Sequence, residues 1–352
     1  MSNVEESPVL AHVDGHAGHL VLNRPRAINA LTHEMVTIIR RVLDEWAADP
    51  AVQTVVLTGS GDRGLCAGGD IVSIYHDGIA GGTASTAFWA DEYRLNAEIA
   101  EYPKPFVAVM DGIVLGGGIG LSAHASIRVV TERSKLGMPE TGIGFFPDVG
   151  GTYLLSRAPG ELGTHLALTA GLVGAGDAIA VGLADWYVPS DRLPDLLTAL
   201  ASQDAATAVA SFADPVPESG LIGDREWIDE AYEGDDLVKI YSRLADADVP
   251  AAREAAVVLL TKSPTSLKVT LRALRAAADL PSLPAALEQE YRLSVRLHGS
   301  HDFLEGVRAQ VIDKDRNPRW SPATFDGVSD ESITAHFATL GDAELGLTDA
   351  SS

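Results

Sequence analysis

The chain has 352 residues, of which 46% are hydrophobic, so it can bury a sizeable core and is not a disordered protein. Lysine and arginine number 26 against 49 aspartate and glutamate residues, which gives a net charge of −23. This charge argues against nucleic acid or an anionic membrane surface as the main partner, although a local basic patch can still bind a small anion. The sequence contains no run of about 18 apolar residues that would predict a membrane span.

A single cysteine, Cys66, rules out an internal disulfide and is typical of a reducing compartment. The first residues lack the basic and apolar regions of a secretory signal. Together these features predict a cytoplasmic protein. A stretch rich in proline, aspartate and serine at 203–225 predicts a boundary, with one region over 1–202 and a mostly helical region over 203–352.

The beginning of the chain alternates strand and helix signals. Apolar and polar residues alternate over 9–23 around Asp14-Gly15, which predicts a β-hairpin. Thr32 is placed to cap a helix whose apolar residues repeat at helical spacing. A short apolar, β-branched run at 52–57 predicts a buried strand, and the glycine-rich loop 59–70 follows it.

Glycines at 78, 81 and 82 predict a mobile loop over 71–86, before a helix over about 87–101. Later patterns continue the alternation of strands and helices, which predicts an α/β fold. The expected elements are a strand at 106–110, glycines at 116–118, a strand at 126–130, and helices from about 150, from 161, at 266–276 and at 287–297.

Two glycine-rich loops, each just past a strand, carry the first indication of chemistry. Gly69 lies in one loop and Gly117 in the other. Backbone N–H groups at such positions lack partners, and two of them aimed at one oxygen form an oxyanion hole. Glu140 and Asp148 follow in the short motifs MPE and FPD and offer carboxylates as acid, base or nucleophile. The combination predicts a site that polarises a carbonyl group.

Each of these features also has a simpler explanation. The glycines can serve tight turns and close packing. Asp148 precedes a predicted helix and can act as its N-cap, and Glu140 can be a solvated loop acid.

Other chemistries have weaker support in the sequence. Cys66 is better explained as a buried structural thiol than as a nucleophile, because no histidine partner is identified. The histidines at 12, 16 and 19 lack the cysteine or carboxylate that would complete a metal site. The run GIGLSA at 118–123 resembles a dinucleotide-binding fingerprint, but no clear acidic partner follows at a strand end.

Four blocks in order resemble the crotonase (enoyl-CoA hydratase/isomerase) superfamily: LNRPRAINAL at 22–31, GLCAGGDI at 64–71, VLGGGIGLSAHASIRV at 114–129 and MPETGIGFFPDVGG at 138–151. The likeness continues through GLADWYV at 182–188. The motif FPDVGG and the tail EYRLSVRLHGSHDFLEGVRAQVIDKDRNPRW at 290–320 resemble the subgroup of 3-hydroxyisobutyryl-CoA hydrolases, thioesterases of valine breakdown. The resemblance implies a crotonase-like spiral of ββα turns followed by a mostly helical C-terminal region.

The resemblance also implies roles for individual residues. Gly69 and Gly117 would donate the two oxyanion-hole hydrogen bonds to the thioester oxygen of a bound acyl-CoA. Glu140 matches the catalytic glutamate that hydratases and hydrolases share, and Asp148 supplies an acid where hydratases have glycine. Glu92 matches a substrate-contacting glutamate of the hydrolase subgroup.

Further implications concern the cofactor, the partners and the oligomer. Arg24 and Ala27 match the region that meets the CoA nucleotide. No metal or redox cofactor is implied, because coenzyme A is itself part of the substrate. Many superfamily members form trimers or hexamers, so a homo-oligomer is possible for this chain.

One departure from the hydratase pattern favours a particular reaction. Gly120 stands where hydratases have a second catalytic glutamate, and hydration of a double bond is helped by two carboxylates on one water. We therefore expect hydrolysis of 3-hydroxyisobutyryl-CoA to 3-hydroxyisobutyrate and CoA, with Glu140 either attacking the thioester or activating water. Two alternatives remain: a hydratase or isomerase with Asp148 as a relocated acid, and a non-catalytic acyl-CoA-binding protein.

Overall fold

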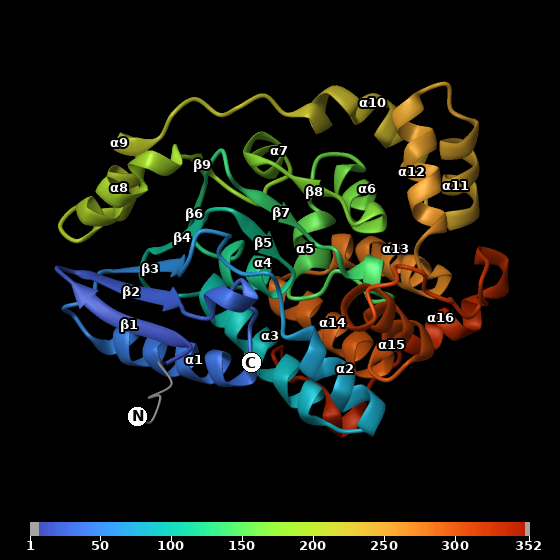
Figure 1. Cartoon of the computed structure of the whole chain (residues 1–352), viewed down its shortest axis with the longest axis horizontal. Coiled ribbons are helices and arrows are strands. Elements are labelled where there is room, and N and C mark those ends of the chain that lie inside the picture. The colour runs from blue at the N-terminus through green and yellow to red at the C-terminus, as the bar shows by residue number, and fades with distance from the viewer. Residues whose placement is uncertain (1–6, 349–352) are drawn as a thin grey trace.

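The computed structural model describes residues 7–348 (Figure 1). The strands lie on one side of the molecule and the C-terminal helices on the other, which confirms the predicted α/β class. Within the described range, no helix combines the length and the apolar character needed to cross a membrane.

The main sheet has six strands in the order β1-β2-β3-β4-β6-β9. Strands β1 and β2 form the hairpin expected around Asp14-Gly15, and every later pair in this sheet is parallel. Strands β3, β4 and β6 are mostly buried because helices or loops cover both faces of a parallel sheet. The strands of both sheets are β1 Val9–Asp14, β2 Ala17–Leu22, β3 Thr54–Gly59, β4 Phe106–Met110, β5 Ile113–Leu115, β6 Ile127–Val130, β7 Lys135–Gly137, β8 Leu172–Val173 and β9 Trp186–Tyr187.

A second, smaller sheet holds one glycine-rich loop beside the other. It contains β5, β7 and β8, with β5 leading directly into the glycines at 116–118. Cys66, from the loop 59–70, forms an isolated bridge with Val114 in β5, and its carbonyl accepts a hydrogen bond from the N–H of Leu115 at 2.9 Å. Backbone pairing therefore brings together two segments that lie about fifty residues apart in the sequence.

The helices largely follow the predicted pattern. Thr32 caps α1, because its hydroxyl accepts a hydrogen bond from the N–H of Met35. The helices are α1 His33–Ala48, α2 Ile71–Ala80, α3 Ala84–Ala100, α4 Gly117–Ser122, α5 Gly151–Leu155, α6 Leu162–Thr169, α7 Ala175–Ala180, α8 Leu193–Leu200, α9 Ala205–Phe212, α10 Gly220–Tyr232, α11 Leu237–Asp246, α12 Pro250–Leu260, α13 Pro264–Asp279, α14 Leu283–Leu297, α15 His301–Val307 and α16 Asp330–His336.

The described chain after β9 forms its regular structure from helices, as the resemblance implies. Helices α10 to α16 share one hydrophobic core with the sheet, extending from Leu20 in β2 to Phe303 in α15, whereas α8 and α9 pack in a second hydrophobic cluster with Val56, Val107 and Val129 of the sheet. Helices α13 and α14 pack against α5 and α3, so the C-terminal region covers the segment that carries Glu140 and Asp148. The division into 1–202 and 203–352 stays a prediction.

The expected mobile loop over 71–86 is wrong, because most of this segment is helical. Asp70 caps α2 by accepting a hydrogen bond from the N–H of Ser73, and Gly81 ends the helix in the left-handed conformation, with φ at +62°. Helix α3 then begins at Ala84. Two of the glycines that predict a loop therefore mark the junction between two helices.

Asn29 fastens the first loop to the loop that carries Gly69. Its side chain is fully buried, and its amide nitrogen lies 3.1, 3.2 and 3.1 Å from the carbonyl oxygens of Ser60, Gly64 and Leu65. Its side-chain oxygen accepts from the N–H of Arg24 at 2.9 Å. We expect Asn29→Ala to lower the free energy of unfolding in urea by roughly 2–3 kcal/mol, because buried polar groups lose their partner.

Asn23 offers a matched control, because its side-chain amide donates a solvent-exposed hydrogen bond to the backbone carbonyl of Ser7. Asn23→Ala should cost less than about 1 kcal/mol. An equal loss of stability in the two variants would contradict the structural role of Asn29.

Candidate functional site

A cavity of about 210 Å³ brings together all five residues that the sequence predicts for the acyl site. Glu92 comes from α3, Glu140 from the short 3₁₀ helix Glu140–Ile143, and Asp148 from the loop before α5. Gly69 and Gly117 come from the two glycine-rich loops. The rest of the wall is largely apolar and includes Ile71, Ile74, Phe88, Trp89, Phe145 and Phe303.

The N–H groups of Gly69 and Gly117 lie close together at the cavity. A Cβ placed on Gly117 would be 3.3 Å from the nitrogen of Gly69 and 2.7 Å from Oε1 of Glu92, so a side chain there would push against both the other loop and the Glu92 carboxyl group. Gly117 is the first residue of α4, where an N–H has no partner within the helix. Within residues 7–348 neither N–H donates to a protein acceptor. Both are therefore available to a carbonyl oxygen in the cavity.

Three carboxyl groups share this desolvated space. Glu92, Asp148 and Glu140 are 2%, 6% and 9% exposed, so the explanation of Glu140 as a solvated acid is excluded. Burial, with the nearby charges of Asp148 and Glu140, raises the pKa of Glu92 well above its ordinary value. Burial and the charge of Asp148 also raise the pKa of Glu140. At neutral pH the cavity therefore holds carboxyl protons that exposed acids would release.

Asp148 is positioned by a partner on another helix. Its Oδ2 accepts a hydrogen bond from the buried hydroxyl of Tyr93 in α3 at 2.7 Å. Burial raises the pKa of Asp148 to about 7, while the Tyr93 hydrogen bond lowers it. The N-cap of α5 is Gly150, without a side-chain hydrogen bond, so the explanation of Asp148 as an N-cap is also excluded.

Gly120 faces a space too small for a second catalytic glutamate. A Cβ at this position would lie 2.7 Å from the Cβ of Val149 and 2.9 Å from Nδ2 of Asn96. Neither neighbour is the far end of a long flexible side chain. The position that carries an acid in the hydratase pattern is therefore closed by packing in this chain.

The first loop does not contribute to the walls of this cavity. Arg24 donates to the carbonyl of Ala30 at 2.5 Å and pairs with Asp70 at 3.2 Å, so its guanidinium fastens the loop to the start of α2. Ala27 is exposed. Their contact with the CoA nucleotide stays a prediction.

The alternative sites are absent from residues 7–348 or explained by packing. Cys66 is completely buried, and burial raises the pKa of its thiol to about 12, as expected for a structural cysteine. His12 and His19 stack on each other with ring centroids 5.0 Å apart. No group of three or more potential metal ligands occurs in this part of the chain.

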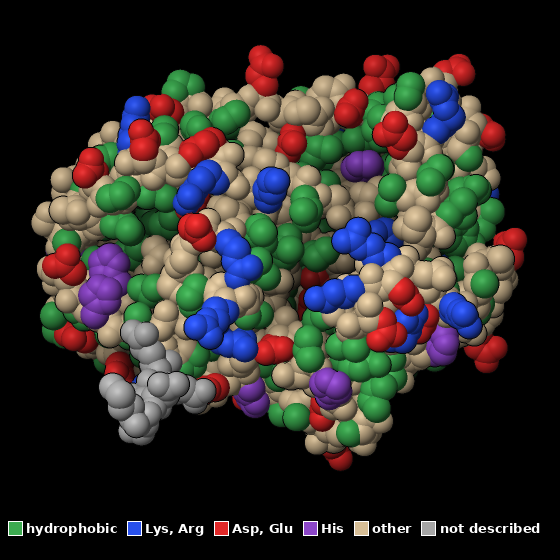
Figure 2. Space-filling view, viewed as in Figure 1, with side chains coloured by type: hydrophobic (Ala, Val, Ile, Leu, Met, Phe, Trp, Pro, Cys, Tyr) green, Lys and Arg blue, Asp and Glu red, His purple; other side chains and the backbone are tan. Residues whose placement is uncertain are grey.

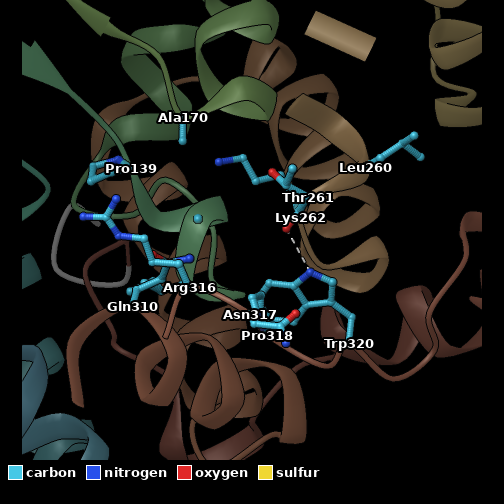
Figure 3. A pocket seen from close by; sticks show the side chains of 12 residues that line it. Pro139, Ala170, Leu260, Thr261, Lys262, Gln310, Arg316, Asn317, Pro318 and Trp320 are labelled. Carbon is cyan, nitrogen blue, oxygen red and sulfur yellow. Dashed lines mark hydrogen bonds between the residues drawn. The ribbon is translucent and has the colours of Figure 1, made fainter. Parts of the chain in front are cut away.

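A second cavity of about 580 Å³ adjoins the first and shares Pro139 and Ile143 with it (Figure 3). Lys262 and Arg316 enter it from different sides. The Lys262 ammonium lies 3.7 Å from where Gly142 would carry a Cβ, and burial lowers its pKa. Across residues 7–348 neither cation has a carboxylate within 4.0 Å. Figure 2 shows lysine and arginine side chains gathered around a hollow in the middle of this face.

Sequence reasoning missed this cationic pair. Lys262 and Arg316 are 54 positions apart and belong to no motif that would link them. Tyr93 was also missed, although it directly follows Glu92. A tyrosine amid the apolar residues of a helix is usually part of the core, so only the fold reveals its contact with Asp148.

The raised pKa of Asp148 predicts a pH-dependent stability. Between about pH 4 and about pH 7, the native state retains a proton that the unfolded state releases, so the free energy of unfolding falls as the pH rises. Asp148→Asn removes the contribution of Asp148 to this dependence and should stabilise the protein at pH 8 by roughly 1–3 kcal/mol, while the contributions of Glu92, Glu140 and Glu290 remain. Urea unfolding across this range tests the prediction. Asp326→Asn, at an exposed position, controls for the lost charge. If the free energy of unfolding depended on pH in the same way in the parent protein and in Asp148→Asn, the prediction would be refuted.

Comparison with known proteins identifies the family. A family model described as enoyl-CoA hydratase/isomerase matches residues 17–337. The protein named 3-hydroxyisobutyryl-CoA hydrolase, mitochondrial, from Gallus gallus is 40% identical over 350 residues, covering 96% of this chain and 91% of that protein. The Homo sapiens protein of the same name is 38% identical, covering 96% and 90%.

Solved structures with a similar fold carry different names. A carnitinyl-CoA dehydratase from Mycobacterium thermoresistibile has a TM-score of 0.93 and 51% identity, with 97% of this chain and 98% of that chain covered. An enoyl-CoA hydratase from Rhodobacter sphaeroides 2.4.1 has a TM-score of 0.91 and 43% identity, with 96% and 99% covered. These similarities confirm the crotonase-like fold.

The names of the curated relatives contradict the expected cytoplasmic location, because they describe mitochondrial proteins. The expectation rested on one cysteine and on the lack of a secretory signal. Neither feature distinguishes the cytosol from another reducing compartment.

The match of the family model and the near full-length similarity to these proteins agree with the fold and with the glycine-rich loops that line the cavity. The chain belongs to the enoyl-CoA hydratase/isomerase family.

Proposed function

We propose that this protein hydrolyses the thioester of 3-hydroxyisobutyryl-CoA, releasing 3-hydroxyisobutyrate and CoA, as a step in valine breakdown. The observation that carries the proposal is the cavity in which two unpaired backbone N–H groups lie beside Glu140 and Asp148. The names of the relatives from Gallus gallus and Homo sapiens support this choice of substrate.

In this mechanism the thioester oxygen accepts hydrogen bonds from the N–H groups of Gly69 and Gly117. The oxygen gains negative charge when the carbonyl carbon is attacked, and each backbone donor is typically worth about 3–4 kcal/mol of transition-state stabilisation. The apolar wall strengthens these interactions because it excludes water.

Glu140 is the group that begins the attack. Its Oε2 is buried without a hydrogen-bond partner among residues 7–348, and its Oε1 lies 2.5 Å from where Gly116 would carry a Cβ, directly beside the oxyanion-hole segment. Two routes fit this position. The carboxylate either attacks the thioester to form an anhydride, which water then hydrolyses, or removes a proton from an attacking water.

Asp148 and Glu92 also line the cavity. Asp148, with a pKa of about 7, can exchange a proton with the departing thiolate or the incoming water near neutral pH. Glu92 Oε1 is buried without a protein partner and is available to the substrate hydroxyl. No step requires a metal ion or a redox cofactor.

The alternative reaction is hydration or dehydration of an enoyl-CoA, which the names of the two similar solved structures favour. The packing around Gly120 weighs against it. A glutamate at position 120, where the hydratase pattern has its second acid, would have to displace Val149. Asp148 does not replace it in an unbonded state, because its carboxyl group is hydrogen-bonded to Tyr93.

The adjoining cationic cavity suits the phosphate groups of CoA. We propose that Lys262 and Arg316 bind them, because these cations have no carboxylate partner among residues 7–348 and their cavity meets the acyl cavity at Pro139 and Ile143. A local cationic pocket of this kind lets an acidic protein bind an anionic substrate.

The first test is an assay for thiol release from 3-hydroxyisobutyryl-CoA and, separately, for loss of the enoyl absorbance of crotonyl-CoA. We expect thiol release from the first substrate, and Glu140→Ala should lower kcat at least about 1,000-fold because the attacking group is lost. The matched control is Glu254→Ala, an exposed position on α12, which should leave kcat unchanged.

Hydration of crotonyl-CoA without thiol release would instead support the hydratase alternative, and binding without either reaction would support a non-catalytic role. A single turnover in heavy-oxygen water tests for the anhydride route. Label in the Glu140 side chain indicates an anhydride that water opens at the Glu140 carbonyl carbon, and label in the released acid alone excludes opening at that carbon.

The cationic cavity makes a separate prediction about substrate binding. Lys262→Ala and Arg316→Ala should each raise KM for the CoA thioester about 10-fold, and high salt should reduce the difference. Lys239→Ala, at an exposed position on α11, is the matched control. An N-acetylcysteamine thioester lacks the phosphates, so its KM should be the same in the parent protein and in the Lys262→Ala and Arg316→Ala variants. An equal response for both substrates would refute this assignment.

A further inference from the structure

A chain of buried hydroxyl groups leads away from Asp148 into the C-terminal helices. The Tyr93 hydroxyl lies 2.7 Å from Oδ2 of Asp148 and 2.6 Å from Oγ of Ser294 in α14. Ser294 Oγ in turn lies 3.0 Å from the backbone carbonyl oxygen of Glu290, one helical turn earlier. Tyr93 and Ser294 are both fully buried.

This chain can be hydrogen-bonded in two directions. With Asp148 ionised, Ser294 donates to Tyr93 and Tyr93 donates to the carboxylate. With Asp148 protonated, the carboxyl group donates to Tyr93, Tyr93 donates to Ser294, and Ser294 donates to the Glu290 carbonyl. Each hydroxyl donates one hydrogen bond in either arrangement, and Ser294 accepts one from Tyr93 only when Asp148 is protonated. The hydroxyl protons only rotate, so no bond to hydrogen breaks within the chain.

A second set of contacts anchors α14 to the segment that carries Asp148. The carboxylate of Glu290 is fully buried and accepts hydrogen bonds from the N–H groups of Gly150 and Thr152 at 2.6 and 3.0 Å, and from the Thr152 hydroxyl. These are the unpaired donors at the start of α5. Glu290 thus fixes the backbone two residues beyond Asp148, and Ser294 extends from the same helix.

We propose that Tyr93 is a positioning residue for Asp148, and that Tyr93, Ser294 and the Glu290 carbonyl together keep its carboxyl group hydrogen-bonded in both protonation states during catalysis. This inference rests on the proposed function in that Asp148 gains and loses a proton in each cycle. The proton itself passes between Asp148 and the substrate, the leaving thiolate or water.

Three further carboxyl groups and one histidine lie near Asp148. Glu92 extends from α3, Glu140 from the 3₁₀ helix and Glu290 from α14, while His124 contacts the neighbouring Val149 carbonyl at 2.8 Å. Burial disfavours the ionised form of Asp148 and so raises its pKa, and the Tyr93 hydroxyl is the side-chain donor that favours the ionised form. Loss of that donor should therefore raise the pKa of Asp148.

The test is Tyr93→Phe in the full-length protein. We expect kcat to fall about 10-fold with KM changed less than about 2-fold, because the substrate still binds while the proton-exchanging group loses its partner. The limb of the pH profile that belongs to Asp148 should move to higher pH. Ser294→Ala should shift it in the same direction by less, and Ser294→Thr, which keeps the hydroxyl, should restore the parent profile.

Tyr291→Phe is the matched control. Tyr291, in α14, is buried like Tyr93 and packs edge-on against it, with ring centroids 6.3 Å apart. Asp148 is bonded to the hydroxyl of Tyr93 and not to that of Tyr291. This variant loses the same hydroxyl group from the same aromatic cluster. It should leave the pH profile unchanged, and an equal shift in both tyrosine variants would reduce the effect to packing and overturn the proposal.

An infrared titration makes the outcome independent of the reaction. The carboxylic-acid band that is lost in Asp148→Asn belongs to Asp148, and in Tyr93→Phe its midpoint should move to higher pH. If the midpoint shifts but the parent protein does not hydrolyse the thioester, the role of Tyr93 beside Asp148 stands and the proposed function is rejected. An unshifted midpoint in an active enzyme would reject the role of Tyr93 and leave the proposed function intact.

Discussion

The crowding of Glu92, Glu140 and Asp148 into one buried, largely apolar cavity is the constraint on which the rest of the site depends. Charges of one sign in a medium of low polarity repel one another strongly, so these groups cannot all be ionised. The protein tolerates this cost because α3, the 3₁₀ helix and the loop before α5 are held by independent contacts. The same cost keeps protons in the cavity at a pH where exposed carboxyl groups have lost theirs.

The C-terminal helices support this arrangement. Helix α14 supplies Glu290, which binds the free N–H groups at the start of α5, and Ser294, which contacts Tyr93. Helix α15 places Phe303 in the cavity wall. The sheet and glycine-rich loops provide the backbone donors, whereas the helical region encloses the carboxylates and excludes water. Each part would be incomplete as an acyl site without the other.

Charge is distributed unevenly between the surface as a whole and the cavity beside the acyl site. The protein is strongly acidic as a whole, yet unpaired cations gather at the cavity beside the acyl site. Long-range repulsion of an anionic substrate by the acidic surface is screened by salt over about 8 Å, while contacts within a pocket act at shorter range. Net charge therefore disfavours the binding of extended anionic partners more than the binding of a small molecule bearing phosphates.

Sequence alone determined the α/β class, the hairpin at the start, the two glycine-rich loops and the pair Glu140 and Asp148, because these depend on local patterns and on motifs of the family. It failed over 71–86, where glycines at a junction of two helices resemble those of a loop.

Only the tertiary structure decided which side chains contact these residues. Tyr93 and Ser294 are 201 positions apart, and Lys262 and Arg316 come from separate segments, so no local pattern links either pair. Their proximity follows from the packing of α14 on α3 and of the C-terminal loop beside the acyl cavity. The protonation of Asp148 likewise depends on burial, a property that the folded chain creates and that a residue's type and spacing do not specify.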